Sequence, residues 1–255
     1  MGTHYENLSS NTLFHFTPKL EYLQSILLNN FQPRYSLESS SFLNNKLLNM
    51  DLAYPMVCFC DIPLSKLKRH IGTYGNYGLG LKKEWGSRNH LSPVFYTRKG
   101  SNTTNSFEQL MYWFISIKAK LNYEEQKIYS QRFSEILMHT KPYYGKMYRN
   151  GKAVNKRFYD EREWRWIPKL DHKKFRSHLS KDELEIDSIK FNQIVSEHRR
   201  LKFTPSDIEY IILNSENEID GFINVLEGED LKYDSKTIKK LTSRIITKDQ
   251  IRNDF

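Results

Sequence analysis

The first thirty residues of the chain predict a strand, a turn and a helix, in that order. Apolar and polar residues alternate from Leu13 to Phe16, and Thr17 and Pro18 follow. Leucine and isoleucine then recur at helical spacing from Leu20 to Leu27. Because Pro18 has no backbone N–H to leave unpaired, it suits the first position of a helix, with Thr17 as the N-cap. A chain that begins this way favours a fold in which helices pack against a sheet.

The rest of the sequence contains further segments with the apolar pattern of a strand or of a helix. Apolar runs at Met56–Cys60, Pro93–Thr97 and Asp207–Leu213 favour buried strands, and Arg244–Thr247 predicts a last short strand. A second helical pattern runs from Tyr123 to His139 and follows a stronger one, whose apolar stripe comprises Leu110, Trp113, Phe114, Ile117 and Leu121. Since no repeat or linker separates these segments, we expect one domain over residues 1–255. Its fold class is α+β, with a twisted mixed or antiparallel sheet as the core and flanking helices.

The composition is typical of a globular protein of the cytoplasm. Hydrophobic residues make up 38% of the chain, but no uninterrupted apolar stretch is long enough to cross a membrane. The first residues lack the basic and apolar regions of a signal peptide. Cys58 and Cys60 lie two apart on a predicted strand, too close to join two parts of the fold. Since no second cysteine pair accompanies them, we predict a reducing compartment and no metal site.

The charge balance favours an anionic partner. The formal net charge is +9, from 39 basic and 30 acidic residues. A segment from Lys141 to Arg162 interleaves tyrosines with cations and is expected to be a loop. Cations hold phosphates while tyrosines stack on exposed bases, so this segment predicts a nucleic-acid contact, although a solvated loop explains it equally well. The cations in question are Lys141, Lys146, Arg149, Lys152, Lys156 and Arg157.

Two features suggest a nucleotide site without the glycine-rich fingerprint of a dinucleotide-binding fold. The imidazole of His15 could donate to a ribose hydroxyl, with Thr17 adding a second contact, although a lone strand histidine is more often a packing residue. Tyr74 and Tyr77 lie in a glycine-punctuated stretch and could stack on a flat ring. The alternative for this stretch is a turn-rich hairpin that contains aromatic residues.

Glu161 and Glu163 form the candidate acidic pair. They lie two apart at the start of a predicted strand that also carries Trp164 and Trp166, so their side chains are expected on one side. A carboxylate beneath a ribose would stabilise the positive charge that develops when an N-glycosidic bond breaks. The alternative is an edge strand whose charges are solvated.

Four runs of residues together resemble the AbiGi family of abortive phage resistance proteins. They are Leu13–Thr17, Met56–Ser65, Tyr74–Leu81 with Glu84–Gly86, and Glu161–Arg165. Proteins of this family are commonly labelled as antitoxin partners. The first strand, with a histidine and a threonine before a helix, is also similar to that of DarT-type and other ADP-ribosyltransferases.

The second resemblance implies an ADP-ribosyltransferase-like fold and NAD as a substrate. His15 and Thr17 would contact the ribose, Tyr77 or Tyr74 would pack on nicotinamide, Glu163 would be the catalytic carboxylate and Glu161 would orient the acceptor. The leading hypothesis is therefore an NAD-dependent ADP-ribosyltransferase of phage defence that modifies nucleic acid. The alternatives are a non-enzymatic, antitoxin-like protein that binds a partner of the defence system, and a nucleic-acid-binding regulator.

Overall fold

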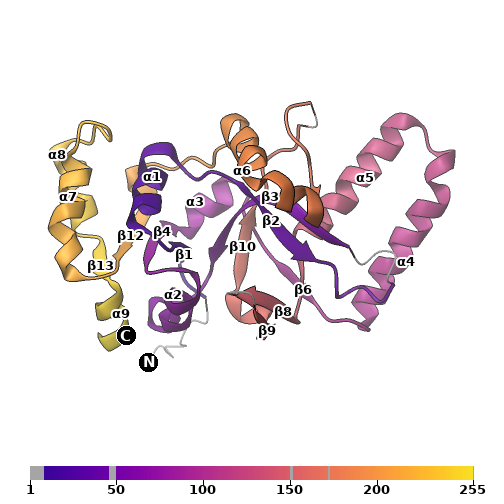
Figure 1. The fold of residues 1–255 in the computed structure, drawn as a ribbon, viewed down its shortest axis with the longest axis horizontal. Helices are drawn as coiled ribbons and strands as arrows, with labels where there is room; N and C mark the ends of the chain where they lie inside the picture. Colours follow the sequence, from indigo (N-terminus) through magenta and orange to yellow (C-terminus); the bar gives the residue numbers. More distant parts are fainter. Residues whose placement is uncertain (1–8, 46–49, 150–151, 172, 255) are drawn as a thin grey trace, which may run out of the picture. The chain divides into compact units, whose positions relative to one another are not determined.

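A computed structural model describes residues 9–45, 50–149, 152–171 and 173–254, which form an α+β fold (Figure 1). The chain divides into two compact units that are both discontinuous in sequence. The first unit comprises residues 1–32, 57–92 and 199–255, and the second comprises 33–56 and 93–198. The long strand β3 (Asp51–Cys60) contributes residues to both units. That residues 1–255 act as a single domain stays a prediction.

In the first unit, a mixed sheet has the strand order β13-β12-β4-β1-β3. Its strands besides β3 are β1 (Thr12–Thr17), β4 (Tyr77–Lys82), β12 (Ile208–Leu213) and β13 (Ile245–Thr247). All neighbours are antiparallel except β12 and β13, which are parallel. The strands predicted at the start of the chain, at Met56–Cys60, at Asp207–Leu213 and at the last short run are therefore confirmed.

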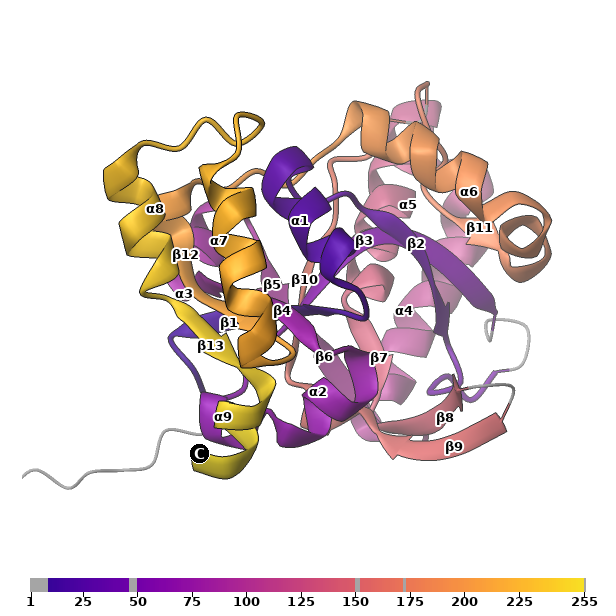
Figure 2. The ribbon, with the colours of Figure 1, turned by 60° about the vertical axis from the view of Figure 1, so that its left-hand side comes forward.

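Helices cover this sheet, and both of its faces are apolar. They are α1 (Leu20–Asn29), α2 (Lys68–Tyr74), α3 (Lys83–Arg88), α7 (Ile219–Glu227), α8 (Ser235–Thr242) and α9 (Lys248–Asp254). Leu13 and Phe14 are neighbours on β1 and point to opposite faces, yet both are buried. Figure 2 shows α7 and α8 side by side, and α9 near α2. The apolar core of this unit therefore lies on both sides of β1.

The glycine-punctuated stretch is partly strand. Gly78 and Gly80 lie on β4 directly opposite Phe16 and Phe14 of β1. A Cβ atom on either glycine would lie 2.9 Å from the facing aromatic ring. These two glycines therefore make room for phenylalanine side chains of the neighbouring strand.

The predicted N-cap of the first helix is wrong by two residues. Thr17 is the last residue of β1 and pairs with Tyr77, which holds its backbone extended. Helix α1 begins at Leu20, and Lys19 occupies the N-cap position without a side-chain hydrogen bond. Strand pairing therefore outweighs the local capping preference at this position.

In the second unit, the amino-terminal half of β3 pairs antiparallel with two strands. These are β2 (Arg34–Ser39) and β11 (Leu179–Ser180). Helix α6 (Lys181–His198) packs against both, and its Asn192 side chain accepts a hydrogen bond from the Tyr35 N–H. The short β5 (Ser92–Pro93) precedes β6 (Phe95–Thr97), which is parallel to β7 (Thr140–Pro142). Strand β10 (Glu163–Trp166) lies between β3 and β5 in the strand order, and the Val94 N–H donates a hydrogen bond to the Glu163 carbonyl.

The segment from Lys141 to Arg162, predicted to be a loop, forms regular structure instead. Strands β8 (Tyr144–Arg149) and β9 (Lys152–Arg157) make an antiparallel hairpin, followed by a 3-10 turn at Phe158–Glu161. The ring of Phe158 lies where a Cβ atom of Gly145 would otherwise project. The loop prediction is wrong because the segment buries an aromatic residue and pairs its backbone.

Helices α4 (Asn102–Ile117) and α5 (Tyr123–Met138) form an antiparallel hairpin (Figure 1). Ser101 caps α4, while Asn122 and Glu125 form a capping box on α5. The rings of Phe114 and Phe133 stack with their centroids 5.0 Å apart and join the two helices. Both predicted helices are therefore confirmed. In the described ranges, no helix combines the length and the apolar character needed to span a membrane.

Candidate functional site

The four residues predicted to bind a nucleotide all lie in the first unit. Thr17 is buried and sits opposite Tyr77 in the pairing of β1 with β4. Gly75 has a φ of 144°, and a Cβ atom there would lie 2.1 Å from the carbonyl oxygen of Thr17. The structure thus brings Thr17, Tyr77 and the end of α2, where Tyr74 lies, to one end of β1.

The polar groups of His15 and Tyr77 have partners within the unit. The Nδ1 atom of His15 lies 2.8 Å from the Cys58 carbonyl oxygen. The His15 ring packs against those of Phe31 and Phe59. Tyr77 donates to Glu218 at 2.7 Å, and burial together with this bond raises the pKa of Tyr77 to about 12. His15 therefore contributes to packing; that it and its neighbours contact NAD stays a prediction.

The candidate acidic pair belongs to a buried ionic cluster in the second unit. Glu163 accepts from Arg165 Nε at 2.8 Å and from Lys141 Nζ at 2.9 Å. Glu161 accepts from the same lysine at 3.0 Å and forms an ion pair with Lys156 at 2.7 Å. We call these residues, together with Glu38 that pairs with Arg165 at 2.8 Å, the ionic cluster. It contains three carboxylates and three cations, so its formal charges cancel.

Backbone geometry makes the two glutamates converge. Glu161 ends the 3-10 turn, Arg162 has a left-handed φ of 43°, and Glu163 begins β10. Their carboxylates meet at Lys141, as the two-residue spacing predicted, but the convergence comes from this kink rather than from strand alternation. The interpretation as a solvated edge strand is wrong, because Glu161 and Glu163 are only 5% and 6% exposed.

The cluster keeps its members charged. Burial alone would raise the pKa of Glu163, but the charges of Arg165 and Lys141 outweigh it and hold that pKa below its usual range. For Glu161 the opposing charge of Lys141 likewise outweighs burial and lowers the pKa. Burial would lower the pKa of Lys141, yet the surrounding glutamates raise it. The result is a set of fixed, mutually neutralised charges.

The hydrogen bonds of Glu163 within the cluster limit its possible role in catalysis. A carboxylate that stabilises a ribosyl cation presents an oxygen to the sugar, whereas both oxygens of Glu163 accept hydrogen bonds within the cluster. The catalytic assignments of Glu163 and Glu161 stay predictions, and they require the ion pair with Lys141 to open. The sequence-based reading missed Lys141, Arg165 and Glu38 as partners of this pair; the spacing of Glu163 and Arg165 on one strand face was the available signal for Arg165.

The six cations predicted to hold phosphates differ in their surroundings. Lys141 and Lys156 belong to the ionic cluster, and Arg157 pairs with Asp160 at 2.7 Å on the surface. Lys146 is exposed on β8. Arg149 and Lys152 end and begin the strands of the hairpin, and their side chains lie outside the described residues. Three of the six residues thus pair with carboxylates, two of them within the ionic cluster, and contact of this set with nucleic acid stays a prediction.

The α4–α5 hairpin exposes an apolar surface of a kind that a folded core normally covers. On the stripe that predicted α4, Phe114 is buried, but Leu110 and Trp113 are 55% and 56% exposed. We call the exposed apolar residues of the two helices the hairpin surface. It comprises Leu110, Tyr112, Trp113, Ile115, Tyr123, Ile128, Tyr129 and Ile136. On α4, Leu110 and Trp113 share one side of the helix and Tyr112 and Ile115 share the other, so apolar side chains are exposed on more than one side of the hairpin.

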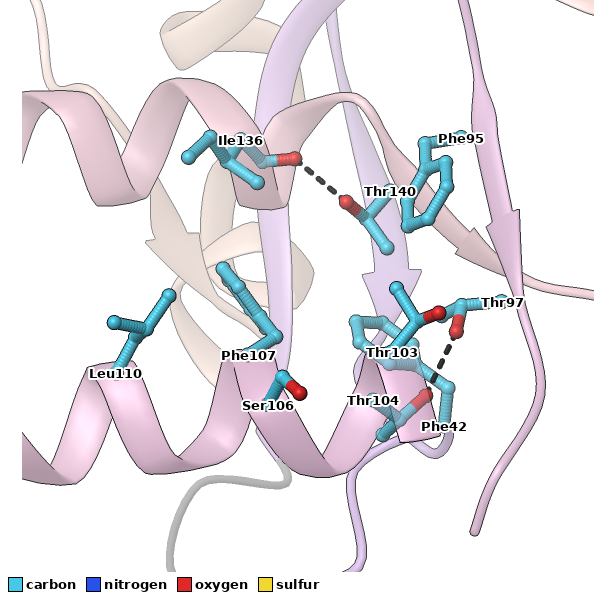
Figure 3. A pocket seen from close by; sticks show the side chains of 10 residues that line it. All are labelled: Phe42, Phe95, Thr97, Thr103, Thr104, Ser106, Phe107, Leu110, Ile136 and Thr140. Atoms are coloured by element: carbon cyan, nitrogen blue, oxygen red, sulfur yellow. Dashed lines mark hydrogen bonds between the residues drawn. The ribbon is translucent and has the colours of Figure 1, made fainter. Parts of the chain in front are cut away.

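A pocket of about 240 Å³ opens beside this surface (Figure 3). Leu110 and Ile136 stand on one side of it and Phe95 on the other, with Phe107 between them, and Phe42 is buried. The exposed lining is almost wholly apolar although it includes several hydroxyl residues. Thr97 and Thr104 hydrogen-bond to each other at 2.7 Å, and Thr140 donates to the Ile136 carbonyl. Their hydroxyls are satisfied within the protein, so they do not make the pocket polar.

Comparisons with known proteins agree on one family. Residues 29–214 match the family model described as "Putative abortive phage resistance protein AbiGi, antitoxin". The chain is also 30% identical over 249 residues to the abortive phage resistance protein AbiGi of Lactococcus lactis subsp. cremoris. That alignment covers 88% of this chain and 99% of the relative. No solved structure matches the chain, so no fold family accompanies this similarity.

Proposed function

The chain belongs to the AbiGi family of abortive phage resistance proteins, and from this premise we propose that it acts in phage defence by binding a protein partner through the hairpin surface. The family description names an antitoxin, and an antitoxin acts on a toxin of the same system. The partner is accordingly a toxin protein, which this chain holds in a non-productive complex. This role requires a recognition surface and no chemistry.

The exposure of the hairpin surface is the observation that carries the proposal. Trp113, Tyr123 and Tyr129 are exposed, and tryptophan and tyrosine are the side chains that most often dominate binding energy at interfaces. Burying one large apolar side chain contributes about 1.5–3 kcal/mol. Two or three such residues would therefore supply much of the free energy of a micromolar complex, which is about 8 kcal/mol.

The fixed charges of the ionic cluster also favour a binding role over transferase chemistry. Glu161 and Glu163 are the carboxylates that would carry transferase chemistry, and both are paired with Lys141. A buried cluster of balanced charge can be retained because it specifies one arrangement of the strands that meet there. In a binding protein this cluster would keep β10 and the β8–β9 hairpin in a fixed arrangement with β7.

Co-purification tests the proposed function. The tagged full-length chain would be co-expressed with the protein encoded beside it in its genome, as wild type and as a Leu110→Ser, Trp113→Ser variant. We expect a stoichiometric complex with the wild type and at least a tenfold loss of affinity in the variant. Tyr22→Ser, which removes an exposed aromatic residue from α1 of the first unit, is the matched control and should bind normally. Equal binding by both variants would refute the role of the hairpin surface.

An NAD-dependent ADP-ribosyltransferase is the second candidate, and one observation favours it. Thr17 and Tyr77 are cross-strand neighbours, and Gly75 brings the end of α2 against them. Residues predicted to hold NAD thus share one end of β1, where an aromatic ring and a hydroxyl could meet a nucleotide. Cleavage of the nicotinamide–ribose bond would release nicotinamide and transfer the ADP-ribosyl group to a nucleic-acid acceptor.

Labelled NAD tests this second candidate. The purified chain would be incubated with the labelled substrate and total cellular RNA, DNA or protein, beside a Glu163→Gln variant. Transfer of label that depends on Glu163 would establish the transferase. Absence of transfer together with absence of NAD binding by calorimetry would leave the partner-binding function alone.

A further inference from the structure

We propose that the apolar pocket beside α4 is an anchor site that receives one large apolar side chain from an acidic, amphipathic helix of the partner. This inference rests on the proposed function and specifies what the hairpin surface recognises. The occupant follows from three properties of the site: its volume, the spacing of the apolar residues beside it and the charge at its rim.

The volume suits a single large side chain. An apolar cavity of about 150 Å³ accommodates a benzene ring and stays dry when empty. The pocket of about 240 Å³ is larger and open on one side, so a phenylalanine or leucine side chain can enter it from outside. Thr97, Thr104 and Thr140 direct their hydroxyls to partners within the protein, and the other two hydroxyl residues of the lining, Thr103 and Ser106, are exposed. Since the accessible lining is almost wholly apolar, a charged or amide side chain would lose most of its hydration there with little compensation.

The spacing beside the pocket suits a helix. Ile136 lines the pocket, and Tyr129 lies seven residues earlier on α5, which places both on one face of that helix. Seven residues rise about 10.5 Å, the same separation as that between positions i and i+7 of a partner helix lying along the hairpin. On α4, Trp113 follows Leu110 by three residues and extends the apolar path in the same direction. A partner helix with its first anchor in the pocket would therefore place its second beside Tyr129 and Trp113.

The charges at the rim are predominantly basic. Arg98 and Lys99 are exposed just before α4, while Arg132, one turn before Ile136, forms an ion pair with Glu135 at 2.9 Å. Glu108 lies buried behind the rim, where it accepts hydrogen bonds from Asn44 and Asn45 and interacts with the charge of Lys99. The chain as a whole has a net charge of +9, so two copies would repel one another whereas an acidic partner would be attracted. The occupant is accordingly an acidic helix rather than a second copy of this chain.

Designed peptides test the inference directly on the full-length chain. The probe is an 18-residue helical peptide with phenylalanine at positions i and i+7 and glutamates on its remaining faces. The first matched peptide has lysine in place of every glutamate, and two others have alanine in place of one phenylalanine each. Calorimetry should show binding of the acidic peptide, at least tenfold weaker binding of the lysine peptide, and a loss of about tenfold or more for one of the alanine peptides.

Blocking the mouth of the pocket should weaken this recognition. Ser106 and Thr103 are exposed residues of the pocket lining, so Ser106→Trp and Thr103→Trp place an indole at its mouth without disturbing the core. Both variants should bind the acidic peptide at least tenfold more weakly, whereas Ser87→Trp, an exposed serine on α3, should bind like the wild type. Urea denaturation would verify that all three variants are folded.

The outcomes separate this inference from the proposed function. Peptide affinity unchanged by Ser106→Trp and Thr103→Trp, or no peptide binding at all, overturns the anchor site. If the natural partner still co-purifies with both pocket variants, the proposed function stands while the anchor site fails. Equal affinity for the acidic and lysine peptides overturns the charge preference. Self-association that Ser106→Trp abolishes would make a second copy the occupant and would also contradict the inference.

Discussion

Replacing Lys141 by methionine should destabilise the protein strongly, because this lysine links two glutamates of the ionic cluster. Its Nζ atom lies 2.9 Å from Glu163 and 3.0 Å from Glu161. At an effective dielectric constant of about 20, each contact is worth about 5.5 kcal/mol of direct attraction, most of which offsets the desolvation of the lysine. Without Lys141, the buried Glu161 and Glu163 and the partly buried Glu38 face two cations. Removing one partner of such a pair typically costs about 3–5 kcal/mol, which is the loss we expect in the free energy of unfolding.

Urea denaturation followed by circular dichroism measures this loss. Lys146→Met is the matched control, since Lys146 is an exposed lysine of the neighbouring hairpin; it should change the free energy of unfolding by no more than about 0.5 kcal/mol. Comparable slopes of the two transitions would show that the same structure unfolds in each variant. A loss below about 1 kcal/mol for Lys141→Met would refute the view that its charge is required by the cluster, because a surface ion pair costs no more than that.

Further predictions concern acid stability, the backbone and catalysis. The pKa of Glu163 is lowered in the folded state, so its ion pairs stabilise the protein above the unfolded pKa of about 4.3. This contribution is lost as the pH falls. The free energy of unfolding measured from pH 7 to pH 3 should therefore decline less steeply in Glu163→Gln than in the wild type. Gly75→Ala should destabilise the protein by about 2 kcal/mol or more in thermal denaturation, because the new Cβ would overlap the Thr17 carbonyl. Gly72→Ala, at a helical position with open space around it, should be neutral or stabilising by about 0.5–1 kcal/mol. An equal effect of the two substitutions would contradict the geometry. If the transferase reading holds, Glu163→Gln should lower the rate of ADP-ribosyl transfer at least a hundredfold in the labelled-NAD assay, and an unchanged rate would exclude this glutamate from the reaction.

The strands and helices that bury apolar runs could be predicted from the sequence. The alternation at Leu13–Phe16 and the run at Met56–Cys60 became β1 and part of β3, since short apolar segments have few other ways to leave water. Thr17 was misassigned as a helix cap because its pairing with Tyr77, sixty residues away, is invisible to local rules. Likewise, the glycine-punctuated stretch admitted either a segment that stacks on a ligand ring or a turn-rich hairpin, whereas its Gly78 and Gly80 accommodate rings of a neighbouring strand.

The candidate sites show a different limit of sequence reasoning. The spacing of Glu161 and Glu163 correctly predicted that the two carboxylates converge, but it carried no sign of their partner Lys141 on β7, 20 residues before Glu161. Nor did it indicate Glu38 of β2, which pairs with Lys141 and Arg165. A stripe such as that of Leu110 and Trp113 predicts a helix, and it does not tell whether the stripe faces a core or a partner. That distinction depends on which other elements pack there, and the exposure of these residues is what points to recognition.

Hydrogen–deuterium exchange of the full-length chain, with and without the protein encoded beside it, tests the central claim most directly. If the hairpin surface binds that partner, amide protection should rise in residues 102–138 and in the strands beside the pocket, β6 and β7. Protection confined to the first unit, with 102–138 exchanging as in the free protein, would contradict the account.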